Sequence, residues 1–210
     1  MSVIRFKNNG IRFDLQIIAS WIRPGSKVLD LGCGHGNLLE YLKEQKGVKG
    51  VGVEKDETKV ASCVAKGLSV VHGDINTEVR GYPEASFDYV IVSQTLQQVY
   101  EPAEVLKQAL RIGNQAIVSF PNFSHWRSRL QLMLKGYAPV TKELPYQWYD
   151  TPNIRVITLK DFRRFAREVG FRILKEAAVA TSQDHHEGRI IQILPTLRAS
   201  YGIYLIGKMK

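Results

Sequence analysis

The stretch Val28-Leu29-Asp30-Leu31-Gly32-Cys33-Gly34-His35-Gly36 decides how the rest of the chain is interpreted. Its apolar start has the composition of a buried strand, which breaks into three alternating glycines before a helical pattern begins at Leu38. A strand, a glycine turn and a helix bring a nucleotide-like ligand against the main chain, because glycine has no Cβ and a helix N-terminus offers free N–H groups. Taken alone, the stretch also fits a structural strand-to-helix turn with no ligand.

The glycine spacing narrows the ligand class. A dinucleotide fingerprint, G-x-G-x-x-G, would place its third glycine at position 37, where this chain has Asn37. The observed G-x-G-x-G after Asp30 and Leu31 resembles the first motif of the class I S-adenosylmethionine (SAM) methyltransferases. In that pattern Asp30 orients the glycine loop or contacts the methionine amine.

Two further acidic residues follow predicted strands. Glu54 ends the strand at 49–53 and lies 22 positions after Gly32, where an acid can accept both hydrogen bonds of a ribose diol. That carboxylate would repel a 2′-phosphorylated cofactor, and the alternative is a surface Glu in a charged run. Asp74 and Ile75 follow the strand at 68–72, where an acid can accept from the adenine amine and an apolar side chain can cover the ring. The ordered set of glycines, Glu54 and Asp74-Ile75 resembles the SAM-binding half of class I methyltransferases.

The fold class predicted from the periodicity is α/β. We expect a Rossmann-like class I methyltransferase fold, with a seven-stranded, mostly parallel sheet and helices on both faces. The last two strands are joined too closely for a helical crossover, so one of them should run antiparallel. The length of 210 residues favours a single domain, 1–210. Expected helices are 11–22, 37–46, 57–66, 102–110, 126–134 and 158–170, and expected strands are 27–31, 49–53, 68–72, 87–93, 115–120, 171–179 and 201–206.

The end of the strand at 87–93 should line the substrate side of the cofactor. Ser93 and Gln94 are therefore predicted cofactor-side residues, and Gln97 and Gln98 follow them. The chain lacks the N/D-P-P-Y tetrapeptide of many amino methyltransferases, and glutamine cannot act as a general base. No catalytic residue is assigned.

Segment 121–157 departs from a minimal domain. It contains four prolines and a high density of aromatic residues. A long segment at the carboxyl edge of a sheet is a candidate lid or docking surface. The alternative is an insertion that packs its own aromatic side chains.

Composition excludes several classes of protein. The charged fraction of 23% is ordinary for a globular protein, and no apolar run has the length of a membrane span. No secretion signal is recognised at the N-terminus, so a cytoplasmic location is expected. The two cysteines form no disulfide framework, and the neighbours His185 and His186 lack a third metal ligand, so no metal site is predicted. The net charge of +9 is spread along the chain, which favours a solvated surface or an acidic protein partner over a nucleic acid.

Longer motifs narrow the resemblance to one family. The stretches S-Q-T-L-Q from Ser93, V-S-F-P-N-F-S-H-W-R-S-R-L-Q-L from Val118 and L-P-Y-Q-W-Y-D-T-P-N from Leu144 resemble the methionine biosynthesis protein MetW family. The similarity covers roughly residues 20–175. It implies a methyltransferase-like fold, linked with homoserine O-acyltransferases of the MetX type.

The resemblance is compatible with two classes of function. It therefore does not decide whether the chain is an enzyme. One is a partner that activates or regulates the acyltransferase, with SAM or its demethylated product S-adenosylhomocysteine (SAH) as a sensed ligand. The other is a SAM-dependent methyltransferase, since methyl transfer needs mainly alignment of the reacting groups. A third hypothesis, an RNA methyltransferase, is motivated only by charge.

Overall fold

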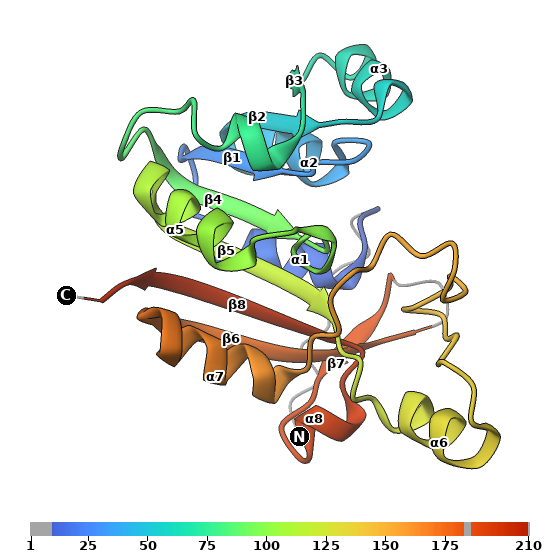
Figure 1. Cartoon of the computed structure of the whole chain (residues 1–210). Coiled ribbons are helices and arrows are strands. Elements are labelled where there is room, and N and C mark those ends of the chain that lie inside the picture. Colours follow the sequence, from blue (N-terminus) through green and yellow to red (C-terminus); the bar gives the residue numbers. More distant parts are fainter. Residues whose placement is uncertain (1–9, 183–185, 210) are drawn as a thin grey trace.

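The structure is a computed structural model that describes residues 10–182 and 186–209. Its centre is one sheet with the strand order β3-β2-β1-β4-β5-β8-β6-β7 (Figure 1). β1 to β5 are mutually parallel, and β8 runs antiparallel to both of its neighbours, β5 and β6. The strands are β1 (Lys27–Leu31), β2 (Lys49–Glu54), β3 (Ser69–His72), β4 (Phe87–Ser93), β5 (Gly113–Pro121), β6 (Phe171–Thr181), β7 (Gly188–Ile190) and β8 (Tyr201–Lys208).

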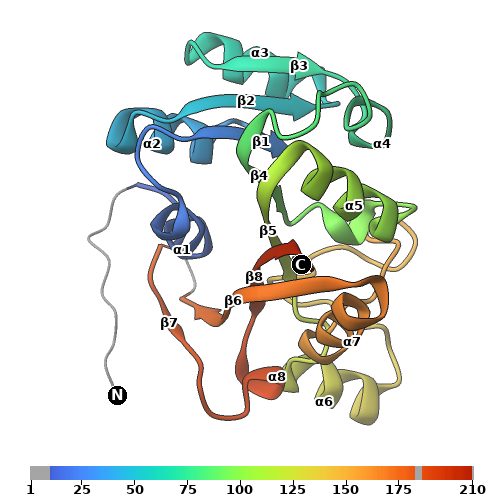
Figure 2. The same cartoon turned by 90° about the vertical axis from the view of Figure 1, so that its left-hand side faces the viewer.

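Helices cover both faces of the sheet (Figure 2). One face carries α1 (Phe13–Trp21), α2 (Asn37–Lys46) and α3 (Glu57–Ala65). The other carries α4 (Ile75–Glu78), α5 (Pro102–Ile112), α7 (Leu159–Val169) and α8 (Pro195–Arg198). The 3₁₀ turn η1 (Leu96–Gln98) follows β4, while α6 (Trp126–Lys135) stands away from the sheet in Figure 1.

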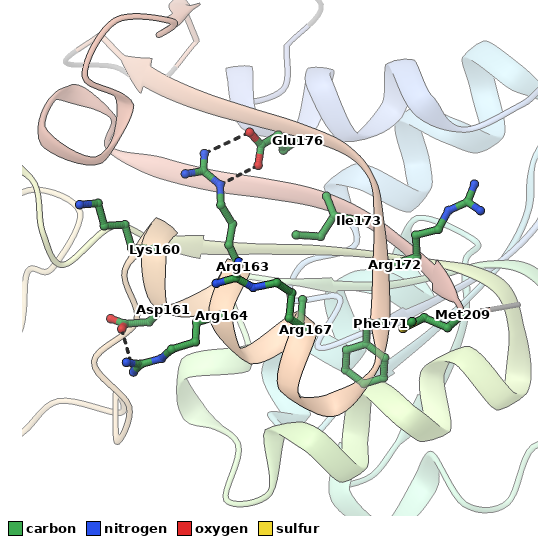
Figure 3. Close-up of a pocket in the computed structure, with 11 residues that line it drawn as sticks. Lys160, Asp161, Arg163, Arg164, Arg167, Phe171, Arg172, Ile173, Glu176 and Met209 are labelled. Atoms are coloured by element: carbon green, nitrogen blue, oxygen red, sulfur yellow. Dashed lines mark hydrogen bonds and ion pairs between the residues drawn. The ribbon is translucent and has the colours of Figure 1, made fainter.

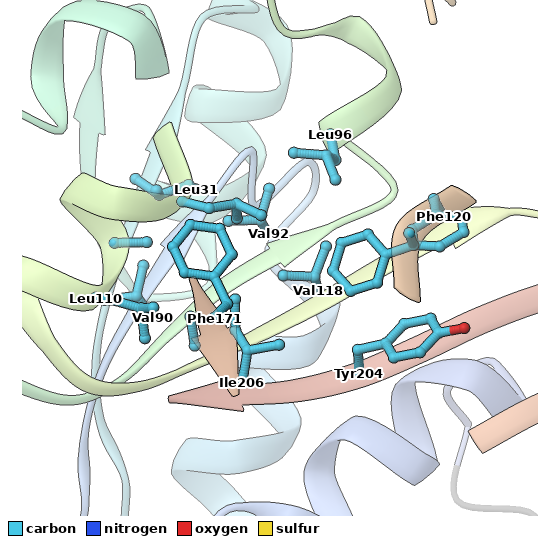
Figure 4. Close-up of a cluster of buried hydrophobic side chains, with 14 of the residues drawn as sticks. Leu31, Val90, Val92, Leu96, Leu110, Val118, Phe120, Phe171, Tyr204 and Ile206 are labelled. Carbon is cyan, nitrogen blue, oxygen red and sulfur yellow. The ribbon is translucent and has the colours of Figure 1, made fainter. Parts of the chain in front are cut away.

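Apolar burial on each face holds these layers together. The cluster under α5 and α7 combines strand residues such as Val90 and Val118 with an aromatic group from three elements (Figure 4). Within that group, the ring of Phe162 lies 5.1 Å from Phe120 and 4.5 Å from Tyr204, centroid to centroid. Removal of this much apolar surface from water is the main stabilising contribution to such a layered fold.

The predicted fold class is confirmed, with one correction to the strand count. The strand at 27–31, the helix at 37–46 and the strand at 87–93 have the predicted bounds, and the antiparallel last strand is β8. The sheet has eight strands because the three residues of β7 pair with residues 179–181 of β6. Two strands, β7 and β8, therefore run antiparallel to β6. Three residues are too few for an alternating pattern, and sequence periodicity missed β7 for that reason.

Short elements were also missed. α4, η1 and α8 have only three or four residues each, and each lies in a stretch without helical periodicity. Across the described residues, the helices are all too short or too polar to cross a membrane.

Candidate functional site: a cavity at the carboxyl ends of β1 to β4

A cavity of about 840 Å³ opens at the carboxyl edge of the parallel strands. Backbone hydrogen bonds hold the loops there: Gly32 N donates to Val53 O at 2.8 Å, and Gly73 N donates to Glu54 O at 3.0 Å. This edge is where doubly wound sheets bind ligands. Of the nine residues predicted for the cofactor, eight line the cavity: Asp30, Gly32, Gly34, Glu54, Asp74, Ile75, Ser93 and Gln94.

The glycines of the turn differ in what they do. Gly32 has φ +83°, and a Cβ there would lie 2.6 Å from Thr95 Oγ1, so the close passage of the loop beside η1 requires glycine. Gly36 does not line the cavity. It precedes α2 with φ +73°, and a Cβ there would lie 2.5 Å from Leu68 Cδ1 and 2.9 Å from Cys63 Sγ. Its contacts are those of a packing residue between α2 and α3.

Glu54 fixes the shape of the loop around the cavity. Its Oε2 accepts a hydrogen bond from Gly34 N at 2.9 Å, and its Oε1 accepts from Lys55 N and Asp56 N at 3.0 Å each. A carboxylate offers about four lone-pair positions, so these three bonds leave room for about one more. A ribose diol at this position would share the two oxygens with the main chain.

Asp30 is a buried acid with an unused oxygen. Its side chain is almost fully buried at the end of β1, and Oδ1 has no hydrogen-bond partner in the described structure. Burial, and secondarily the charge of Glu54, raise the pKa of Asp30 to about 7. A cationic group in the cavity would supply the missing partner and favour the ionised carboxylate.

Asp74 and Ile75 form the far end of the cavity. Asp74 caps α4: its Oδ1 accepts from Asn76 N at 2.8 Å and from Asn76 Nδ2 at 2.6 Å. These bonds do not use Oδ2. Ile75 is half-buried beside it, so a carboxylate oxygen and an apolar surface lie together as an adenine would need.

Ser93 ends β4 on the opposite side of the cavity, and Gln94 follows it. The hydroxyl groups of Ser93 and Ser119 lie 2.9 Å apart, and Gln94 has φ +51°. Gln94 Nε2 donates to Asp14 Oδ2 at 2.7 Å, and the same carboxylate forms an ion pair with Arg12 at 2.7 Å. The start of α1 is thereby tied across this end of the cavity.

Several lining residues were not predicted. Arg12 and Leu15 come from the α1 region, and Tyr146 and Pro152 come from segment 121–157. Nothing in their local sequence marks them, because they reach the cavity through tertiary contacts. Of the neighbouring Gln97 and Gln98, Gln98 lines the cavity, whereas Gln97 is buried and donates through Nε2 to Gln94 O at 2.7 Å.

Neither thiol chemistry nor metal binding is favoured here. Burial raises the pKa of the Cys33 thiol, with the charge of Asp30 adding to the effect, so the thiol stays protonated at neutral pH. His185 lies outside the described residues. His186 lines the cavity, and among the described residues no group of three His, Cys, Asp or Glu side chains could hold a metal ion.

Segment 121–157 both borders the cavity and exposes apolar surface. Ile154 N and Arg155 N donate to Gln97 O at 3.0 Å each, which holds the segment beside η1. Trp148 and Tyr149, between Tyr146 and Pro152, are 76% and 72% exposed. The segment therefore does not bury its aromatic residues in a core of its own.

Helix α6 of the same segment is also unusually exposed. Its only buried residue is Ser128, while Leu132, Met133 and Leu134 face solvent. Contiguous exposed apolar surface of this kind marks interaction sites in soluble proteins.

Comparisons with known proteins agree with this geometry. A family model described as "Methionine biosynthesis protein MetW" matches residues 12–206, a wider range than the motifs indicated. The bifunctional methionine biosynthesis protein MetXA/MetW of Rhodopirellula baltica is 35% identical over 73% of this chain, which spans only 26% of that relative's length. A ubiquinone biosynthesis O-methyltransferase of Burkholderia pseudomallei is 27% identical over 77% of this chain and 73% of its own.

Solved structures share the fold. A SAM-dependent methyltransferase from Archaeoglobus fulgidus superposes with a TM-score of 0.70 at 16% identity, covering 96% of this chain and 95% of that one. A possible histamine N-methyltransferase from Thermotoga maritima gives a TM-score of 0.67 at 19% identity, covering 93% and 87%. At these identities the likeness establishes the class I methyltransferase fold.

Proposed function

Because the chain belongs to the MetW family of methionine biosynthesis proteins, we propose that it binds SAM or SAH and activates or regulates a homoserine O-acyltransferase of the MetX type. The observation that carries the proposal is the relative in which a MetXA part and a MetW part form one chain. Fusion keeps two proteins at high effective concentration, which is useful where they act together.

The exposed segment supports a protein partner. Two exposed apolar groups of segment 121–157 are candidates for docking: the residues of 126–137 and the pair Trp148 and Tyr149, together called the α6 surface here. Aromatic side chains of this kind supply much of the binding energy at protein interfaces. Tyr146 and Pro152 of the same segment line the cavity, so a ligand there would touch the segment that meets the partner.

The cavity residues fit SAM or SAH. The unpaired oxygen of buried Asp30 suits the methionine ammonium, Glu54 suits a ribose hydroxyl, and Asp74 with Ile75 suits the adenine. Gly34 also lines the cavity, and no atom of the described residues lies within 4 Å of where a Cβ would stand there, so a ligand can approach its main chain. Feedback by such a ligand requires that it bind one state of the complex more tightly than the other.

The direct test measures homoserine acyltransferase activity of the purified partner with and without this protein, each with SAM, SAH or neither. We expect a several-fold rise on adding the protein, and a further change when ligand is present. No change in activity, together with no complex on gel filtration, would overturn the partner role.

A SAM-dependent methyltransferase is the alternative, favoured by the eight predicted residues that line the cavity. When bound, SAM would supply an electrophilic methyl group. The protein would then contribute mainly the positioning of the acceptor. Gln94, Gln98 and Tyr146 line the cavity and can form hydrogen bonds, but none of these three side chains is a strong base. Transfer of labelled methyl groups to an acceptor in cell extract, absent with a Gly32→Val variant, would support this alternative.

A further inference from the structure

The outer edge of β6 is open along most of its length. β7 pairs only with residues 179–181 of β6, and Ile191 N donates to Ala178 O at 2.7 Å just beyond. From residue 171 to 177, no described strand pairs with this edge. An open edge carries unpaired N–H and C=O groups that can accept one more strand.

Hollows flank this edge on both faces of the sheet. On the α7 face lies a hollow of about 1190 Å³ whose apolar floor includes Ala166, Phe171 and Ile173 (Figure 3). On the α1 face lies a hollow of about 360 Å³, whose apolar lining is Ile17, Trp21, Ala177 and Ile190 and whose one cationic side chain is Lys175 of β6. Glu176 lines both, so the two hollows meet at the strand edge.

The two hollows differ in charge. The α7 side carries five cationic side chains, of which two are neutralised locally. Arg163 binds Glu176 through two hydrogen bonds of 2.9 and 3.0 Å, and Arg164 lies 3.3 Å from Asp161, as Figure 3 shows. In the part of the chain that the structure describes, the other three form no ion pair: Lys160, Arg167 and Arg172.

This charge pattern selects the occupant. Arg172 on β6, together with Lys160 and Arg167 on the neighbouring α7, would repel the same region of a second copy, which disfavours self-pairing. They attract an acidic segment instead. Side chains of an added strand alternate between the two faces, so one set would enter the basic hollow and the other the apolar hollow beside Trp21.

We propose that residues 171–177 of β6 form a docking edge for an extended segment of a partner protein in which acidic residues alternate with apolar ones. The acidic side chains meet Lys160 and Arg167, the apolar ones meet Ile17 and Trp21, and main-chain hydrogen bonds extend the sheet. This edge is distinct from the cavity and from the α6 surface. The inference therefore does not depend on which ligand or acyltransferase the protein binds.

The test uses fluorescence anisotropy with the full chain and a labelled peptide Glu-Val-Glu-Val-Glu-Val-Glu. Two control peptides separate the contributions: one has the same composition with all Glu before all Val, and the other has N-methyl groups on alternate amides. We expect the alternating peptide to bind at least about tenfold more tightly than either control, because only it can present both faces and form the ladder.

Matched variants of the protein complete the test. The double change Lys160→Glu and Arg167→Glu affects two exposed side chains and should weaken binding by about tenfold. Lys107→Glu, at an exposed residue of α5, should not. Thermal melting checks that all variants fold. The proposal would be overturned if the control peptide with all Glu before all Val, or single-stranded RNA, bound as tightly as the alternating peptide. It would also be overturned if the double change had no effect, or if the alternating peptide did not bind at millimolar concentration.

Discussion

Asp30 holds a carboxyl group where its charge is costly. Its pKa is raised from an ordinary value of 3.8 to about 7, mainly by burial. The folded state therefore holds the proton that the unfolded state loses at lower pH, and the stability from this group falls as pH rises from about 4 to about 7. Asp30→Asn removes that dependence.

The first prediction concerns this pH dependence. Urea unfolding at pH 5 and pH 8 should show that the unmodified chain loses more stability over this range than Asp30→Asn does. The difference is at most about 3 kcal/mol, because only about two pKa units of the shift, from pH 5 to about 7, fall inside this range. Equal losses in the two proteins would show that Asp30 is ionised normally in the folded state.

Glu54 holds the loops at the cavity through hydrogen bonds from Gly34, Lys55 and Asp56. Its carboxylate holds Gly34 N, and we propose that it also accepts a ribose hydroxyl. Glu54→Ala should weaken SAM or SAH affinity by about 10- to 100-fold, the range expected for lost hydrogen bonds to a charged group. Calorimetric titration measures this, with Glu57→Ala on exposed α3 as the matched control. Unchanged affinity would remove the ribose assignment.

At the scale of elements, helix α7 shows how a local signal defines a boundary. Thr158 Oγ1 accepts a hydrogen bond from Asp161 N at 3.1 Å, and Gly170 ends the helix with φ +86°. The helix expected at 158–170 therefore begins at the T-x-x-D pattern of residues 158–161, since a hydroxyl group three residues before a free N–H is a usual N-cap.

The cap can be tested by its free energy. Thr158→Ala should lower the free energy of unfolding by about 1 kcal/mol, because the N–H of Asp161 loses its acceptor. Thr158→Ser keeps the hydroxyl group and should retain most of that stability. Chemical denaturation compares the three proteins, and an alanine variant as stable as the serine variant would mean that the cap contributes nothing.

At the scale of the whole molecule, the α6 surface is exposed apolar surface that the isolated chain leaves in contact with water. Trp148 and Tyr149 pack edge-on, with ring centroids 5.7 Å apart, and both remain largely exposed. Burial of such an aromatic pair in an interface would stabilise a complex by several kcal/mol in total.

The corresponding prediction is a loss of partner affinity. The double change Trp148→Ala and Tyr149→Ala should weaken binding to the acyltransferase partner that we propose by at least about tenfold, as measured by surface plasmon resonance. SAM affinity should stay within about twofold, because neither side chain lines the cavity. Tyr100→Ala, at an aromatic residue of similar exposure outside the segment, is the control. Undiminished affinity of the double variant would exclude this pair from the interface.

The sequence by itself determined the class of fold and most element bounds. Residues 27–46 needed only local information: apolar residues for β1, glycines for the turn and a helical stripe of leucines for α2. The placement of Glu54 and Asp74 also followed from sequence, because the carboxyl ends of parallel strands converge at one edge.

Tertiary structure alone decided the rest. Strand β7 exists because β6 offers it an edge, and Tyr146 reaches the cavity because Gln97 holds the later part of its segment. The role of Gly36 in packing and the bond from Gln94 to Asp14 likewise join residues far apart in the chain. The periodicity of a segment indicates only which of its faces is buried and which is exposed. The contacts of β7, Tyr146, Gly36 and Gln94 depend on which distant segments the folded sheet brings together.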